Sequence, residues 1–218
     1  MNSIFPSVFG RLFTPHLAVD INQQGLVINN KKLTDTLNWC DLTSPICYEY
    51  GVFGQTLRFS TKSRQYRVWM RAYGSHRILK AKTDQLWVNN NIEPLNELLE
   101  NINQFAHHQF LRQSYVADIK QRVKQQYNRW LPWIKKSEAL AVVSTQIKLL
   151  EQYSQWSDSL TRFLQHKYTQ TQLQRYAGFF DNVEANPLTE KQRRACIIDD
   201  DNNLVLAGAG TGKTSVMV

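Results

Sequence analysis

A short glycine-rich segment near the end of the chain carries the residue types best suited to chemistry. It follows the apolar run Leu204-Val205-Leu206 and has the sequence Ala207-Gly208-Ala209-Gly210-Thr211-Gly212-Lys213-Thr214. Glycines let backbone amides turn toward phosphate oxygens, and a following helix presents its positive N-terminal end to the same oxygens. A buried-type strand that enters a loop ending in Gly-Lys-Thr is typical of a phosphate-binding loop. The sequence therefore predicts that this segment binds a nucleotide.

The polar residues of the loop have expected roles. Lys213 would neutralise the β and γ phosphates, and the hydroxyl of Thr214 would coordinate magnesium. We therefore predict ATP and magnesium as cofactors, with Lys213 and Thr214 as candidate catalytic residues and the whole loop as the cofactor-binding site. Ala207 stands where the general pattern has its first glycine.

A second motif precedes the loop and has the sequence Asn186-Pro187-Leu188-Thr189-Glu190-Lys191-Gln192-Arg193-Arg194-Ala195. In order and close spacing, this segment and the glycine-rich loop resemble the Q motif and first motif of superfamily 1 helicases of the UvrD/Rep kind. By that resemblance Gln192 would bind the adenine, because a carboxamide can accept from N6 and donate to N7. Without the loop downstream, Gln192 would be interpreted as an ordinary surface glutamine.

The resemblance implies an ATP-dependent helicase that moves 3′ to 5′ on single-stranded DNA, with residues 184–218 as the start of its α/β ATPase domain. Only four residues follow Thr214. The acidic pair that holds magnesium and the arginines that stabilise transition-state charge are therefore not in this sequence. We expect this truncated chain to be inactive in hydrolysis by itself.

Residues 1–75 have the pattern of a small antiparallel β domain. The first strand pattern has Leu17, Val19 and Ile21 alternating with Ala18 and Asp20. A turn at residues 22–25 then leads into a second apolar run, so the sequence predicts a hairpin. Two further strands are predicted at residues 56–59 and 64–71. In the second of these, one face carries Tyr66, Val68 and Met70, and the opposite face carries Arg67, Trp69 and Arg71.

Residues 76–183 have helical periodicity, so the expected fold class is α+β. Pro94 suits the first turn of a helix. The apolar stripe that follows it comprises Leu95, Leu98, Leu99, Ile102 and Phe105, and the next comprises Val116, Ile119, Val123, Tyr127 and Trp130. Pro132 should end or kink that second helix. A third helix is predicted from 137 to 164, with Val143, Ile147 and Leu150 in register, and a fourth brings together Leu173, Tyr176, Ala177 and Phe180. Turn signals lie at Asn186-Pro187 and at residues 199–203.

The formal net charge of +8 favours a polyanionic partner, because lysine and arginine release counterions from phosphates. The candidate nucleic-acid-binding residues are Lys120, Arg122, Lys124, Arg129, Arg67 and Arg71, with Lys135 and Lys136 nearby. Tyr127, Trp130, Trp133 and Trp69 are interleaved with them and could stack bases. For Tyr127 and Trp130 we favour a place in the core, since they continue the apolar stripe. The expected partner is DNA, single-stranded or forked.

A second interpretation of the N-terminal part is a protein-interaction module. A small β domain followed by a helix loosely resembles a pleckstrin-homology-type fold, which implies docking of a protein partner. Fold alone does not fix function, so this remains an analogy. Binding that weakens steeply with salt would favour DNA, and salt-insensitive binding would favour a protein.

Several other functions are not favoured by the composition. Cys40, Cys47 and Cys196 lack zinc-ligand spacing and are expected to be reduced thiols. The five histidines have no arrangement that suits a metal or a catalytic triad. No apolar run approaches the roughly 20 residues that span a bilayer, so we expect a cytoplasmic protein with no membrane partner.

Overall fold

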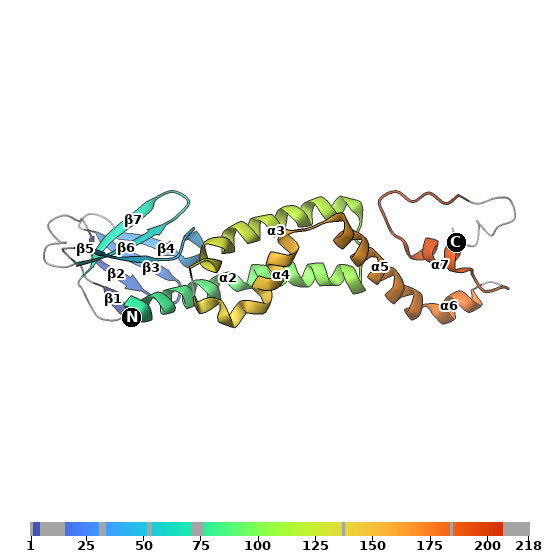
Figure 1. Cartoon of the computed structure of the whole chain (residues 1–218), viewed down its shortest axis with the longest axis horizontal. Helices are drawn as coiled ribbons and strands as arrows, with labels where there is room; N and C mark the ends of the chain where they lie inside the picture. The colour runs from blue at the N-terminus through green and yellow to red at the C-terminus, as the bar shows by residue number, and fades with distance from the viewer. Residues whose placement is uncertain are drawn as a thin grey trace. The chain divides into compact units, whose positions relative to one another are not determined.

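The computed structural model describes residues 2–4, 16–30, 34–51, 54–70, 76–136, 138–183 and 185–206. Two compact units share the chain: unit 1 comprises Met1–Asn96 and Gln126–Lys148, and unit 2 comprises Glu97–Gln125 and Leu149–Val218. The described part is α+β, with antiparallel sheets followed by helices, as the sequence predicts (Figure 1).

Among its described residues, unit 1 has two antiparallel sheets. The first has the strand order β1-β2-β3-β4, with strands β1 (Asn2–Ile4), β2 (His16–Ile21), β3 (Gly25–Asn30) and β4 (Thr34–Asn38). The second has the order β5-β6-β7, with strands β5 (Cys47–Gly51), β6 (Gly54–Ser60) and β7 (Gln65–Met70). A short 3-10 helix, η1 (Trp39–Asp41), lies between them in sequence. The strands predicted around residues 56–59 and 64–71 are confirmed as β6 and β7.

The predicted hairpin is confirmed as the antiparallel pair β2–β3. Its turn is closed by Asn22, whose Oδ1 accepts hydrogen bonds from the amides of Gln24 (2.9 Å) and Gly25 (2.8 Å). A Cβ atom at Gly25 would stand 1.9 Å from the carbonyl oxygen of Leu37 on β4. Only glycine therefore allows β3 and β4 to pair this closely.

The sheets bury the faces that alternation predicts. Tyr66 and Val68 of β7 are buried, whereas Arg67 between them is exposed. Val19 and Ile21 of β2 are also buried. Arg71 and the side chains of Trp69 and Met70 lie outside the described residues.

Helix α2 (His76–His107) corrects the prediction for Pro94, which lies inside the helix and not in its first turn. Proline removes one backbone hydrogen bond and costs about 3 kcal/mol within a helix. Packing on both sides of Pro94 offsets this, since Trp87 before it and Leu95 after it are fully buried. The predicted stripe itself is confirmed: Leu95, Leu98, Ile102 and Phe105 are buried, and Leu99 is half-buried.

Helix α3 (Gln113–Ile134) contains Pro132 in its last turn and continues to Ile134, so the proline does not end the helix where it stands. Val116, Ile119, Val123 and Trp130 are buried along one face, and Tyr127 is half-buried. The second predicted stripe is therefore confirmed.

The single helix predicted from 137 to 164 is wrong. The chain instead forms a 3-10 helix, η2 (Glu138–Val143), then α4 (Ser144–Ser154), and a separate helix α5 (Asp158–Arg175). Ser157 starts α5 as its N-cap, with its Oγ accepting from the amide of Leu160 at 3.3 Å. Val143, Ile147 and Leu150 are nevertheless each buried, as the spacing predicts.

The last helices are short. The helix predicted through Leu173 and Phe180 is broken at Tyr176, whose φ of −104° and ψ of 15° separate α5 from α6 (Ala177–Asn182). Helix α7 (Glu190–Ile197) follows. Leu204, Val205 and Leu206 form no strand and are exposed, so the predicted buried strand is not observed. A strand of this kind needs a partner, and no described strand pairs with it.

Candidate functional site

The residues just before the predicted phosphate-binding loop are fixed within unit 2 by an acidic cluster, Asp199–Asp201. The three aspartates lie at the N-terminus of α3, where backbone amides have no helical acceptors. Asp200 Oδ1 accepts from the Gln113 amide (3.0 Å), and Asp201 Oδ2 accepts from the Ser114 amide (2.7 Å). We call this arrangement the acidic clip.

Side chains complete the acidic clip. Arg112 donates through Nη2 to Asp199 Oδ2 (2.5 Å) and through Nε to the Asp199 carbonyl (3.1 Å). The Ser114 hydroxyl donates to Asp201 Oδ1 at 2.8 Å. These bonds from Ser114 lower the pKa of Asp201, and the bond to Asp199 raises the pKa of Arg112. From sequence these aspartates indicated only a turn.

Gln192 lies in the first turn of α7, where it forms a capping box with Thr189. Its Oε1 accepts from the Thr189 amide (2.8 Å) and from the Thr189 hydroxyl (2.7 Å). The Thr189 Oγ1 in turn accepts from the Gln192 amide at 3.5 Å. The Thr-Glu-Lys-Gln part of the predicted Q motif therefore defines the start of α7.

A small apolar cluster holds α7 in place. Phe180, Leu188 and Ile197 are buried together, with Tyr168 and Leu173 of α5 packed against them. Arg193 adds polar contacts: its Nε donates to the Leu188 carbonyl at 2.7 Å, and its Nη2 lies 2.6 Å from Asp181 Oδ1. Thus α5, α6 and α7 position Gln192 and the acidic clip as one module.

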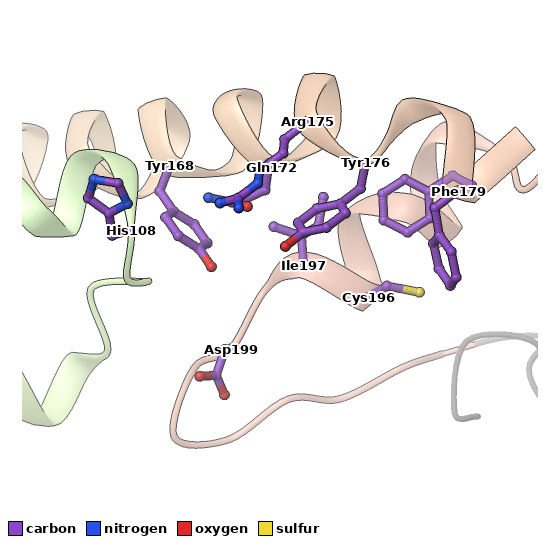
Figure 2. A pocket seen from close by; sticks show the side chains of 10 residues that line it. His108, Tyr168, Gln172, Arg175, Tyr176, Phe179, Cys196, Ile197 and Asp199 are labelled. Atoms are coloured by element: carbon purple, nitrogen blue, oxygen red, sulfur yellow. The ribbon is translucent and has the colours of Figure 1, made fainter.

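An open pocket of about 470 Å³ lies beside this module. Figure 2 shows Tyr168 of α5 and Tyr176, which directly follows α5, extending toward Ile197 and the Asp199 loop. The full lining is His108, Tyr168, Gln172, Arg175, Tyr176, Phe179, Phe180, Cys196, Ile197 and Asp199. Tyr176 and Phe179 are substantially exposed, and the Arg175 guanidinium lies 5.5 Å from the Tyr176 ring centroid. The pocket therefore offers aromatic surface and hydrogen-bond donors.

The titratable groups of this pocket do not favour covalent catalysis. Burial raises the pKa of the Cys196 thiol and that of the Tyr168 hydroxyl, so both stay protonated at neutral pH. No disulfide joins Cys40, Cys47 and Cys196. Over the described part of the chain, no group of three His, Cys, Asp or Glu residues could hold a metal ion.

The candidate cations of α3 do not share one face. Lys120 and Lys124 are one helical turn apart, but Arg122 is two residues from each and points elsewhere. Lys120 Nζ lies 3.7 Å from Asp158 Oδ1, and Arg122 Nη1 lies 3.9 Å from Asp118 Oδ2. Lys124 is exposed. Two of the three charges are therefore partly balanced by carboxylates.

Arg129 belongs to unit 1, where its guanidinium is hydrogen-bonded to Asn91 and to the Cys40 carbonyl. Its Nε donates to Asn91 Oδ1 at 3.0 Å, its Nη2 donates to the same oxygen, and Nη2 also reaches the Cys40 carbonyl at 3.0 Å. Asn91 is itself buried and donates to the Trp87 carbonyl at 2.8 Å. This network joins α2, α3 and the segment after β4.

Arg67 is exposed on β7 and lines an open pocket of about 520 Å³ with Glu49, Arg58 and Lys136. Arg71 and the whole loop Ala207–Thr214, including Lys213 and Thr214, lie outside the described residues. Their predicted roles therefore remain predictions.

Three tryptophans of unit 1 form a closed cluster. Trp87 stacks on Trp133 with ring centroids 3.6 Å apart and meets Trp130 edge-on at 4.8 Å. All three are fully buried, which confirms the core interpretation of Trp130. Trp133, considered above as a stacking ring, is not available to a base.

Comparison with curated proteins finds a helicase-related region in the chain. The relative is DNA helicase IV of Escherichia coli (strain K12), which is 53% identical over 57 residues. The match covers 25% of this chain and 8% of that helicase, so the chain spans a small part of the relative's length. No family model matches the chain, and no solved structure matches it. Among the described residues no helix is long and apolar enough to cross a membrane.

Proposed function

We propose that this chain is the N-terminal part of an ATP-dependent DNA helicase that moves 3′ to 5′ on single-stranded DNA. The observation that carries the proposal is the 53% identity to DNA helicase IV over 57 residues. The Gly-Lys-Thr loop and the preceding Thr189–Gln192 motif support it from the residue types alone. In this proposal residues 1–75, 76–183 and 184–218 are a β domain, a helical region and the start of the ATPase domain.

ATP and magnesium would bind at Ala207–Thr214, with Lys213 on the phosphates and Thr214 on the metal. Gln192 would contact the adenine. Because its Oε1 already accepts two hydrogen bonds from Thr189, contact with the adenine N6 requires exchange of at least one of them. Nucleotide binding should therefore change the start of α7.

The test is equilibrium binding of a fluorescent ATP analogue with magnesium to the 218-residue chain. We expect Lys213→Ala to weaken binding at least tenfold, since it removes the phosphate-neutralising charge. Lys148→Ala, which removes an exposed lysine of α4, should bind like the unaltered chain. Gln192→Ala should reduce the preference for ATP over GTP. Equal binding by the Lys213 and Lys148 variants, or no binding, would contradict the nucleotide site.

The part before the Q motif would act as an accessory DNA-binding region. Its cations Lys120, Arg122, Lys124, Arg129, Arg67 and Arg71 are the candidates from sequence, and single-stranded or forked DNA is the expected ligand. Arg129 has protein partners in the structure, so its removal would act on folding as well. Lys124 is the exposed candidate whose substitution best separates an effect on DNA binding from an effect on folding.

A second candidate function for unit 1 is docking of a protein partner. The two antiparallel sheets followed by α2 are the arrangement on which the pleckstrin-homology analogy rests. A salt series distinguishes the alternatives: DNA affinity falls steeply with salt, whereas an apolar protein contact does not.

A further inference from the structure

Helix α5 exposes a basic and aromatic face that the sequence analysis did not identify. Five exposed residues lie on one side of this helix, because their spacing follows the helical repeat. They are Arg162, Phe163, His166, Lys167 and Gln174. Phe163 is 59% exposed, although phenylalanine is usually buried. We call these five residues the α5 outer face.

The α5 outer face carries positive charge without nearby acidic residues on the same helix. No Asp or Glu occurs from Ser159 to Arg175. The one acid of α5, Asp158, lies in the first turn and is approached by Lys120. No described residue forms an ion pair with Arg162 or Lys167. These two cations therefore remain available to an anionic partner, unlike Lys120 and Arg122.

The opposite side of α5 fixes the orientation of this face within unit 2. Thr161, Leu164, Thr169 and Gln172 are buried there. Gln172 Nε2 also donates to the His107 carbonyl at 2.9 Å, and Gln165 Nε2 donates to the Leu111 carbonyl at 2.9 Å. The helix is thus anchored by polar and apolar contacts, and its outer residues form a preorganised surface.

We propose that the α5 outer face binds single-stranded DNA, with Arg162 and Lys167 on phosphates and Phe163 stacked on a base. The proposal deepens the accessory DNA-binding role and rests on it. Cations that follow the backbone, together with an exposed ring, are the two components of binding with little sequence preference. Arg162 and Gln174 are twelve residues apart, about 18 Å along the helix. That length accommodates several nucleotides.

The test uses the 218-residue chain and a fluorescein-labelled oligothymidylate, with anisotropy measured between about 50 and 200 mM salt. The double variant Arg162→Ala/Lys167→Ala should lower the slope of log affinity against log salt by about 1.4, since each single-strand phosphate contact contributes about 0.7. Lys62→Ala/Lys82→Ala removes two exposed lysines elsewhere and should leave the slope unchanged.

Phe163→Ala should weaken binding at least about fivefold at every salt concentration, because it removes a stacking ring and no charge. Phe163→Tyr should retain affinity. Val142→Ala, at a residue of unit 1 that is 75% exposed, is the matched apolar control and should bind normally. Far-UV circular dichroism of each variant should match that of the unaltered chain.

The outcomes separate this inference from the proposed function. If the chain binds the oligonucleotide but the α5 variants bind no worse than the controls, the inference is wrong and the DNA-binding role stands. If the Arg162→Ala/Lys167→Ala and Lys62→Ala/Lys82→Ala variants lose DNA affinity equally, the attraction depends on overall charge, and the inference is also wrong. If the chain binds no DNA even at low salt, the accessory DNA-binding role itself fails.

Discussion

Trp130 and Trp133 on α3 are fully buried against Trp87, whereas Phe163 on α5 is 59% exposed. Yet Trp130, Trp133 and Phe163 all lie within two residues of a basic residue in sequence. The difference is one of register. Trp130 continues the buried stripe of Val123, so its ring faces the core. Phe163 directly precedes the buried Leu164, about 100° around the helix, and faces out. Interleaved cations and aromatics therefore indicate a nucleic-acid surface only where the rings fall outside the apolar stripe.

The largest effect is expected from a substitution in the buried tryptophan cluster. Trp87→Ala removes the ring that Trp130 and Trp133 pack against and should reduce the free energy of unfolding of unit 1 by about 3–5 kcal/mol. Phe163→Ala should change stability by no more than about 0.5 kcal/mol. Urea unfolding followed by tryptophan fluorescence and far-UV circular dichroism measures both. A similar loss in the two variants would mean that Phe163 is also part of a core.

An intermediate effect is expected from the arginines of the same two helices. Arg129→Ala leaves the buried Asn91 Oδ1 without its donor and should reduce the free energy of unfolding by about 1–3 kcal/mol. Arg162→Ala removes an exposed charge and should alter stability within about 0.5 kcal/mol while weakening DNA binding. The pair is measured by urea unfolding and by anisotropy. If Arg129→Ala is neutral for stability, the network with Asn91 and Cys40 does not hold the unit together.

The apolar stripes of α2 and α3 could be predicted from sequence, because a helix that buries one face repeats apolar residues every three or four positions. Leu98 and Val123 are examples, and both are buried. The hairpin β2–β3 was predictable for a similar reason, since alternation and a turn containing asparagine and glycine specify it. Local periodicity was thus sufficient to predict the buried face of an element from the sequence of that element alone.

The wrong predictions have two causes: packing that no local pattern encodes, and a local capping signal that was missed. Packing of Trp87 and Leu95 keeps α2 helical through Pro94, and no local pattern encodes that packing. The break before α5 did have a local signal, since Ser157-Asp158 is a typical N-cap pair. The acidic clip joins Ser114 to Asp201 across 87 positions of sequence, so its capping role required the structure. The phosphate-binding loop, in contrast, is predicted from eight consecutive residues that lie outside the described part of the structure, so it stays a prediction.

The smallest expected effect concerns the N-terminal end of α3, which is capped by the charged side chains of the acidic clip. The C-terminal end of α3, in contrast, packs through Trp130 and Trp133. The pKa of Asp201 is lowered from its ordinary value of 3.8 by the hydrogen bonds from Ser114. A carboxyl group whose pKa is lowered in the folded state stabilises the fold at pH values above its ordinary pKa. This stabilisation is lost as the pH falls through the lowered pKa. Protection of the Ser114 amide, which donates to Asp201, from hydrogen exchange should therefore decrease below about pH 4.

Asp201→Asn should lower that protection at pH 6 and flatten its dependence on pH, because an uncharged amide interacts less favourably with the helix N-terminus. Asp118→Asn is the matched control, since Asp118 is exposed on the same helix and its contact with Arg122 is long, at 3.9 Å. Amide exchange measured by NMR at several pH values resolves the effect residue by residue. A wild-type profile in Asp201→Asn would show that the charge of the Asp201 carboxylate does not contribute to the capping of α3.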